Sequence, residues 1–363
     1  YKILNGFLIL IGVAIVALGL VLSHDDACEP APIAAAGDEG FSAITYSCYG
    51  DASVLELARL PMPVPAEGEV LVRIHAAGVN PLDYHYMRGT PYLMRLSSGL
   101  GAPDDQRLGV DFAGTVEAVG AGVTRFEPGD AIFGGWSGAF AEYLTLPADR
   151  AIAPKPDNVS FEEAATVPIA AVTALQALRD HGELQAGQKV LINGASGGVG
   201  TFAVQIAKSM GAEVTGVCST RNVELVRSIG ADHVVDYKQD DYTRADARYD
   251  LIVDMVGNHS PGANRKVLKP GGTYVIVGGP KGNWFAPLVN PLKAAVLAPF
   301  VDEKIVTMLA RMTPEDMTTL SELMADGEMR PVLDREFSLS EVPDAIRYSE
   351  SGRARGKIVV TMD

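Results

Sequence analysis

Val190-Leu-Ile-Asn-Gly-Ala-Ser-Gly-Gly-Val-Gly-Thr-Phe-Ala-Val-Gln-Ile-Ala-Lys208 is the most informative stretch of the sequence. A β-branched apolar run leads into a glycine-rich turn, and the turn opens a run of helix-forming residues. Glycines in such a turn let the backbone approach a pyrophosphate, and the helix N-terminus offers it free N–H groups. The stretch therefore predicts a parallel α/β sheet that binds a dinucleotide. The residues predicted to line this site are Gly194, Ala195, Ser196, Gly197, Gly198, Val199 and Gly200.

The end of the next strand distinguishes the two common dinucleotides. Val217-Cys-Ser-Thr-Arg-Asn222 has no acid at the position where an NAD site places Asp or Glu against the adenine ribose. Hydroxyl groups and a guanidinium bind a 2′-phosphate well, whereas a carboxylate repels it. Ser219, Thr220 and Arg221 therefore predict NADPH as the cofactor. The alternative interpretation of Arg221 is an ordinary solvated arginine.

The pattern of the chain differs on the two sides of residue Ala164. After it, strand-like runs alternate with alanine-rich helical runs, which is typical of a doubly wound parallel sheet. Before it, short alternating strands such as 69–75 and 114–119 predict a barrel-like β domain. The predicted organisation is a transmembrane helix at 1–23, a linker at 24–42, a β domain at 43–168 that is completed by 332–363, and a nucleotide-binding domain at 169–331.

The N-terminal residues 3–22 are apolar apart from Asn5 and small glycines. Twenty helical residues extend about 30 Å, the thickness of the hydrocarbon core of a bilayer. We therefore expect a retained single-pass membrane anchor, and not a cleaved signal peptide, whose apolar run is shorter. Lys2 before the helix and Asp25 and Asp26 after it favour an external body. The predicted cofactor is a cytosolic metabolite and favours a body on the cytoplasmic side, and we expect that orientation.

Composition restricts the classes of protein. A chain of 363 residues with 47% hydrophobic residues and 38 glycines fits a globular α/β protein of more than one domain. A net charge of -15 argues against a nucleic-acid-binding protein, which needs a basic surface. Three cysteines cannot build a four-cysteine zinc lobe. Cys28 and Cys48 would pair in an oxidising compartment, but we favour the unpaired state.

Further segments accompany the glycine-rich turn, namely 76–83, 108–116, 138–143, 165–174, 230–237 and 356–360. Together, over about residues 43–363, they resemble the quinone oxidoreductase (zeta-crystallin-like) branch of the medium-chain dehydrogenase/reductase superfamily, near its mitochondrial reticulon-4-interacting type. The resemblance implies a GroES-like catalytic domain into which a Rossmann domain is inserted. The zinc branch of this superfamily has a cysteine where Asn80 stands, and a histidine–glutamate pair near Val110 and Asp111. The resemblance thus implies an enzyme without zinc.

The resemblance also implies roles for individual residues. Asn80 and Asp83 match the pair that lines the substrate cleft of quinone oxidoreductases, where neutral donors stabilise charge on a carbonyl oxygen. His85 stands where the family has a tyrosine, and it is either a general acid or a hydrogen-bonding residue at the rim. Asp83 is alternatively a helix cap. The implied cofactor contacts are Thr173 at the carboxamide, Tyr237 at the adenosine, Gly278 and Gly279 at the nicotinamide ribose, and Arg355 at the phosphate.

These observations favour a membrane-anchored, zinc-independent, NADPH-dependent oxidoreductase that reduces a quinone or an activated enone or aldehyde by hydride transfer. An enoyl-thioester reductase is the alternative enzyme, because sister branches reduce that bond. A catalytically retired, membrane-associated scaffold subunit that keeps its nucleotide site is the third hypothesis, and the intact glycine-rich turn argues against it. The expected partners are a small-molecule substrate and a membrane, and a homodimer or a membrane complex stays open.

Overall fold

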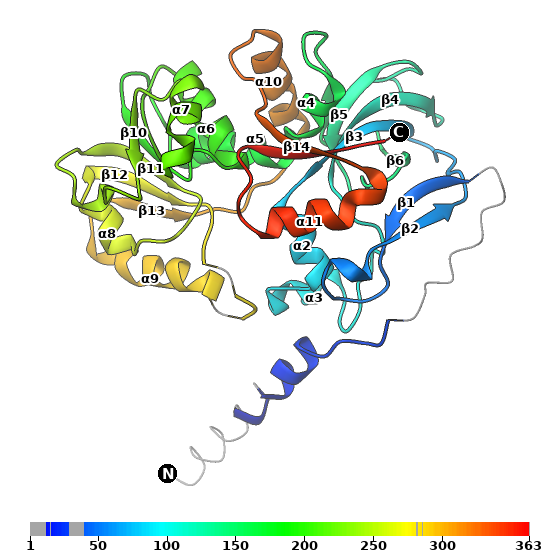
Figure 1. Ribbon diagram of the computed structural model, residues 1–363, viewed down its shortest axis with the longest axis horizontal. Helices are drawn as coiled ribbons and strands as arrows, with labels where there is room; N and C mark the ends of the chain where they lie inside the picture. The colour runs from blue at the N-terminus through cyan, green and yellow to red at the C-terminus, as the bar shows by residue number, and fades with distance from the viewer. Residues whose placement is uncertain (1–11, 15, 29–39, 281, 285, 363) are drawn as a thin grey trace.

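The computed structural model describes residues 12–14, 16–28, 40–280, 282–284 and 286–362. The strand of the glycine-rich stretch belongs to a six-stranded parallel sheet (Figure 1). The strand order is β10-β9-β8-β11-β12-β13. From β8 the chain runs to one edge and then returns to the other side of β8 with β11. This reversal is the topological switch point at which doubly wound sheets bind ligands. The bounds are β8 (Lys189–Asn193), β9 (Glu213–Cys218), β10 (His233–Asp236), β11 (Tyr249–Asp254), β12 (Leu268–Ile276) and β13 (Lys304–Thr307).

Helices connect these strands, as the alternating pattern predicts. The helix α6 (Gly198–Ser209) buries an apolar face that includes Phe202, Val204 and Ile206. Nearly every residue of α5 (Pro168–Gln176) is buried, and a proline at its start suits the first turn of a helix. The other helices of this part are α7 (Val223–Ser228), α8 (Pro261–Arg265), α9 (Val289–Leu297) and α10 (Pro314–Ala325).

A second, mostly antiparallel sheet has the order β14-β15-β3-β4-β5-β7, with β6 paired to β3. The last strand of the chain pairs with β3, so the C-terminus completes the sheet that the N-terminal half begins. In Figure 1 the red C-terminal elements accordingly lie against the blue and cyan ones. The bounds are β3 (Glu69–Val79), β4 (Asp111–Val119), β5 (Ala131–Gly135), β6 (Tyr143–Pro147), β7 (Ile152–Pro154), β14 (Leu333–Ser338) and β15 (Lys357–Thr361). The helices beside it are α2 (Pro81–Arg88), α3 (Arg95–Ser98), α4 (Phe161–Ala165) and α11 (Val342–Glu350), and β1 (Phe41–Thr45) pairs with β2 (Glu56–Leu60).

One hydrophobic core runs through both sheets. It joins Ala113 and Phe133 of the antiparallel sheet to Ile192 of the parallel sheet and Phe202 of α6, and it includes most of α5. The two-domain α/β architecture with GroES-like and Rossmann-like parts is therefore confirmed, and the shared core fixes the two parts against each other.

The predicted membrane anchor, and with it the membrane localisation with a cytoplasmic body, is wrong. None of the described helices is both long and apolar enough to cross a bilayer. Part of the proposed span, residues 3–11 and Ile15, lies outside the described residues. The described helix ends at Leu22, which is 1% exposed, whereas the large apolar side chains before it are half or more exposed. An apolar run alone does not establish a membrane span, because apolar side chains also stand exposed on a helix such as this one.

Residues 24–28, which follow this helix, are hydrogen-bonded to the rest of the protein and do not form a free linker. Asp26 N donates to Gly101 O at 2.9 Å, and the guanidinium of Arg95 donates to Asp25 at 2.7 Å. Cys28 and Cys48 form a disulfide with a Cα–Cα separation of 5.0 Å. Our preference for the unpaired cysteines was therefore wrong, because the docked segment brings the two thiols together. The rest of the predicted linker, 29–39, lies outside the described residues.

Candidate functional site

The glycine-rich turn between β8 and α6 forms a cradle of bare backbone. Gly194 has a φ of +93°, which L side chains rarely adopt. A Cβ atom on Gly200 would lie 2.1 Å from the carbonyl oxygen of Gly194, so no side chain fits there. The turn stays tight, and the N-terminal N–H groups of α6 point toward the switch point of the sheet. This arrangement suits a pyrophosphate.

The carboxyl ends of β11 and β12 form a second backbone wall. A Cβ on Gly278 would meet the carbonyl oxygen of Met255 at 2.0 Å, and one on Gly257 would meet the Cα of Gly279 at 2.9 Å. Buried Asp254 fixes this wall by accepting from the backbone N–H of Gly257 at 2.8 Å. Because the carboxyl ends of parallel strands share one edge, this wall and the glycine-rich cradle lie at the same edge of the sheet.

The residues after β9 meet the C-terminal part of the chain. The guanidinium of Arg221 is exposed, and it donates to the carbonyl oxygen of Arg353 at 2.8 Å. Hydrogen bonds from Thr220 hold the pKa of Asp236 below its ordinary value. The Thr220 hydroxyl thus already donates to a carboxylate at the end of β10. Tyr237 follows Asp236 and exposes its ring, with the ammonium of Lys238 5.2 Å from the ring centre.

Asn80 and Asp83 lie in a buried polar cluster, which we call the Asn80 cluster: Asn80, Asp83, Asp111 and Lys357. Each side chain is at most 3% exposed. Asn80 Nδ2 donates to Asp111 Oδ2 at 2.9 Å, and Lys357 Nζ donates to Asn80 Oδ1 at 2.5 Å. The backbone N–H of Asn80 donates to Asp83 Oδ2 at 2.7 Å, a capping contact at the start of α2. The cap interpretation of Asp83 therefore has direct geometric support.

Burial governs the protonation of this cluster. Together with the charge of Asp111, burial raises the pKa of Asp83 to about 8, against the opposing effect of the hydrogen bond from Asn80 N. Burial also raises the pKa of Asp111 to about 6, against the opposing effect of the Lys357 ammonium 3.9 Å away. The pKa of Lys357 is lowered for the same reason. Oδ1 of Asp83 has no hydrogen-bond partner among the described residues, which is consistent with a protonated, neutral acid.

His85 lies at the edge of this region, half-buried on α2. Its Nδ1 lies 2.7 Å from the carbonyl oxygen of Thr90. A carbonyl can only accept, so Nδ1 carries the proton and Nε2 of the neutral ring has none to give. His85 can therefore serve as an acid only as the imidazolium.

Two residues that were predicted to contact the cofactor, Thr173 and Arg355, form hydrogen bonds within the protein. The hydroxyl of Thr173 donates to the carbonyl oxygen of Ile169, one turn earlier in α5, at 2.6 Å. The backbone N–H of that same Ile169 donates to Asp111 at 3.1 Å, so α5 connects Thr173 to the Asn80 cluster. Arg355 is exposed, and its backbone N–H donates to Asp334. Its predicted phosphate contact has no support from these interactions.

The last turn of the chain before β15 brings the cofactor cradle and the Asn80 cluster together. Gly356 N donates to the carbonyl oxygen of Ser196 at 3.0 Å, and Gly356 forms a parallel bridge with Gly197. The next residue is Lys357, whose ammonium lies in the Asn80 cluster. Sequence analysis missed Lys357, Asp111 and Arg353 as site residues. The signal that was available is a charged residue at the start of an otherwise apolar strand, as in Lys357-Ile-Val-Val.

The residues at the zinc position of the superfamily do not suit that metal. The Lys357 ammonium donates to the Asn80 oxygen, so a cation already occupies the acceptor that a metal would need. Within the described residues, no group of three or more His, Cys, Asp or Glu side chains could hold a metal ion.

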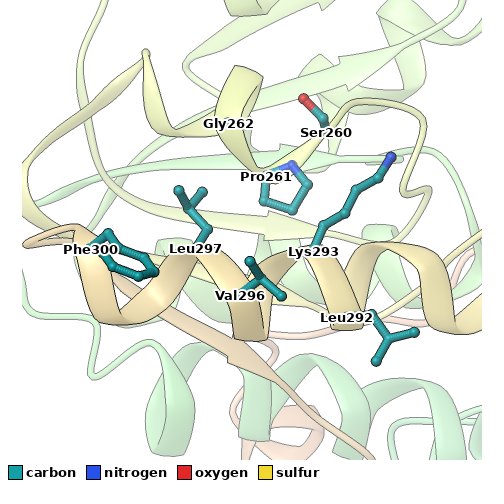
Figure 2. A pocket seen from close by; sticks show the side chains of 8 residues that line it. All are labelled: Ser260, Pro261, Gly262, Leu292, Lys293, Val296, Leu297 and Phe300. Atoms are coloured by element: carbon teal, nitrogen blue, oxygen red, sulfur yellow. The ribbon is translucent and has the colours of Figure 1, made fainter. Parts of the chain in front are cut away.

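An apolar hollow of about 560 Å³ lies elsewhere, between α8 and α9 (Figure 2). It is lined by Ser260, Pro261, Gly262, Leu292, Lys293, Val296, Leu297 and Phe300. None of the predicted site residues lines it, so we do not assign it to the cofactor or the substrate.

Comparison with known proteins identifies the family of the chain. Residues 66–157 match the alcohol dehydrogenase GroES-like domain, and residues 229–360 match the zinc-binding dehydrogenase domain. The chain is 34% identical to the chloroplastic quinone-oxidoreductase QR1 of Triphysaria versicolor, over 88% of this chain and 97% of that protein. It is 32% identical to the mitochondrial NAD(P)H oxidoreductase RTN4IP1 of Danio rerio, over 86% and 89%.

Two further matches are an enoyl reductase and a solved quinone oxidoreductase structure. Trans-enoyl reductase pgmF of Aspergillus terreus is 35% identical over 84% of this chain and 90% of its own length. The solved quinone oxidoreductase of Coxiella burnetii superposes with a TM-score of 0.78 at 28% identity, over 89% of this chain and 99% of that one. The chain belongs to the medium-chain dehydrogenase/reductase superfamily, among the relatives of quinone oxidoreductases. It is an NAD(P)H-dependent oxidoreductase.

Proposed function

We propose that the protein uses NADPH to reduce a quinone or an activated enone or aldehyde. The observation that carries this proposal is the pairing of an uninterrupted backbone cradle at Gly194 and Gly200 with a polar amide at Asn80, linked through the last strand of the chain. The bound dinucleotide supplies a hydride, and the protein must orient it and stabilise the charge that develops on the substrate.

The protein's own groups divide this work between them. The cradle and the N–H groups of α6 hold the pyrophosphate. Arg221 and Ser219 bind the 2′-phosphate, because a guanidinium pairs with phosphate and no acid occupies the end of β9. Asn80 presents an amide donor: one N–H goes to Asp111 at 2.9 Å, whereas the other has only a long 3.4 Å contact to Gly78 O. The second N–H is the one that can turn to a substrate oxygen. Asp83 holds α2 in place, and His85 contributes an acid only when protonated.

An enoyl-thioester reductase is the second candidate. The 35% identity to a trans-enoyl reductase favours it as strongly as the quinone oxidoreductase matches favour the first. Both reactions place a hydride on an acceptor conjugated to a carbonyl. The purified full chain should be assayed for NADPH oxidation against quinones, enones, aldehydes and enoyl thioesters in parallel. Turnover of the thioester alone would replace the first candidate with the second, and turnover of none would contradict both.

The choice of NADPH has its own test. Arg221→Ala should weaken NADPH binding about 10–100-fold and leave NADH binding unchanged, since a charge-assisted hydrogen bond contributes about 1.5–3 kcal/mol. Arg227→Ala is the matched control, because Arg227 is exposed on the adjoining α7 and pairs with Glu224. Titration by cofactor fluorescence measures both affinities. Equal losses for the two cofactors, or tighter NADH binding by the unaltered protein, would contradict the assignment.

A further inference from the structure

Lys357 is a buried lysine at a junction between two parts of the site. It is the first residue of β15, and its side chain is 3% exposed. Its ammonium donates to Asn80 Oδ1 at 2.5 Å and to the carbonyl oxygen of Val79 at 3.2 Å. Asp111 Oδ2 lies 3.9 Å away and balances the charge. Burying an ammonium costs several kcal/mol, and an apolar side chain of similar length would fill the same space without that cost. The position therefore calls for an explanation in terms of function.

The ammonium controls which way the amide of Asn80 faces. The oxygen and nitrogen of an asparagine amide are nearly the same size, so shape alone does not choose between two flipped orientations. Lys357 can only donate and ionised Asp111 can only accept, and they lie on opposite ends of the amide. This arrangement forces the oxygen toward Lys357 and the N–H₂ group toward Asp111. In the flipped orientation Asn80 would present an acceptor to a substrate carbonyl, and the two oxygens would repel each other.

The same lysine also contacts the cofactor cradle. A Cβ atom on Gly198, the first residue of α6, would lie 3.1 Å from Cδ of Lys357, so the lysine stem passes directly beneath the start of that helix. The residue before it, Gly356, is hydrogen-bonded to Ser196 in the cradle. One side chain thus touches the backbone that would hold the pyrophosphate and the amide that would face the substrate.

We propose that Lys357 is a positioning residue that fixes the orientation of the Asn80 amide and holds it in register with the cofactor cradle. The inference rests on the proposed function of Asn80. It assigns Lys357 no contact with the substrate, so its effect on turnover must pass through Asn80.

A double-mutant cycle on the full chain tests this dependence. Lys357→Met should lower kcat at least about tenfold with little change in substrate KM, whereas in the Asn80→Ala background the same change should have almost no further effect. Lys269→Met is the matched control, because Lys269 forms an ion pair with Asp250 far along the chain from Asn80. It should leave kcat unchanged in both backgrounds. Thermal unfolding and NADPH titration of each variant accompany the kinetics.

Loss of the buried ammonium leaves Asp111 unbalanced and can itself unfold the protein. The charge-balanced pair Lys357→Met with Asp111→Asn removes both charges and keeps an acceptor for Ile169 N. This variant should regain stability but not kcat. Recovery of kcat together with stability, or equal losses from Lys357→Met with and without Asn80, would overturn the inference and leave the role of Asn80 intact. Normal turnover in Asn80→Ala alone would instead contradict the proposed role of Asn80, and the inference about Lys357 with it.

Discussion

The cofactor cradle and the Asn80 cluster are built in opposite ways. The cradle consists of consecutive residues, 194–200, and acts through its backbone, and at Gly194 and Gly200 the absence of a side chain is essential. The Asn80 cluster acts through side chains that come from the start of α2, from β4 and from β15, and its Asn80–Lys357 hydrogen bond joins residues 277 positions apart. A backbone site tolerates no added atom, whereas a side-chain cluster depends on the balance of its charges and donors. The two regions should therefore fail differently when they are altered.

The cradle should show the largest effect. Gly200→Ala places a Cβ atom 2.1 Å from the Gly194 carbonyl oxygen, so the turn must open and dinucleotide binding should be lost. Gly262→Ala is the control, since no atom lies within 4 Å of the corresponding Cβ in α8. Calorimetric titration of NADPH against both variants makes the comparison. Normal affinity in the Gly200 variant would show that the cradle is not the pyrophosphate site.

Asn80 should show a smaller effect, and one on chemistry instead of binding. Removal of one positioned donor typically lowers kcat by about 10²–10³-fold. We expect Asn80→Ala to lose turnover in this range at near-normal NADPH affinity, and His85→Phe to lose less, because neutral His85 carries no proton on Nε2. Single-turnover hydride transfer measures both variants. A larger loss in the His85 variant would reverse the order of the two residues.

The third expected effect concerns stability and its dependence on pH, and not binding or turnover. Burial raises the pKa of Asp83 to about 8 in the folded protein, against 3.8 as the model-compound value. The folded state therefore binds this proton more tightly, and its contribution to stability is full below about pH 4 and is lost as the pH rises through 8. Each pH unit in this window costs about 1.4 kcal/mol of unfolding free energy at most.

Asp83→Asn removes this titration and should flatten the decline of unfolding free energy between pH 5 and 8. Asp157→Asn, at an exposed position, is the control and should leave the decline unchanged. Denaturant unfolding at a series of pH values gives the comparison. Parallel curves for Asp83→Asn and the unaltered protein would show that Asp83 is ionised in the folded state.

The same contrast explains what the sequence could predict. The cradle and the parallel strands are local patterns, and the predicted strand at 190–192 lies within β8. The Asn80 cluster needs the start of α2 and two distant strands, β4 and β15, to meet, and nothing in the local sequence around Lys357 indicates which residues surround it. The N-terminal helix failed for a related reason, because the burial of Leu22 and the pairing of Cys28 with Cys48 depend on the body against which the segment packs. The prediction that Asn80 does not bind zinc came from the resemblance alone. The contact of Lys357 with the Asn80 oxygen supplies the physical reason for it.

The docking of the N-terminal segment has a practical consequence for the boundaries of any recombinant form. The guanidinium of Arg95 is 1% exposed, lies over the rings of Tyr49 and Tyr92, and takes Asp25 as its carboxylate partner. A form that starts at the β domain, as domain prediction would suggest, removes that partner together with the carbonyl oxygen of His24, which also accepts from Arg95. It also leaves Cys48 as an unpaired thiol beside Tyr49. Residues 22–28 are thus part of the smallest unit in which the body keeps its charges balanced.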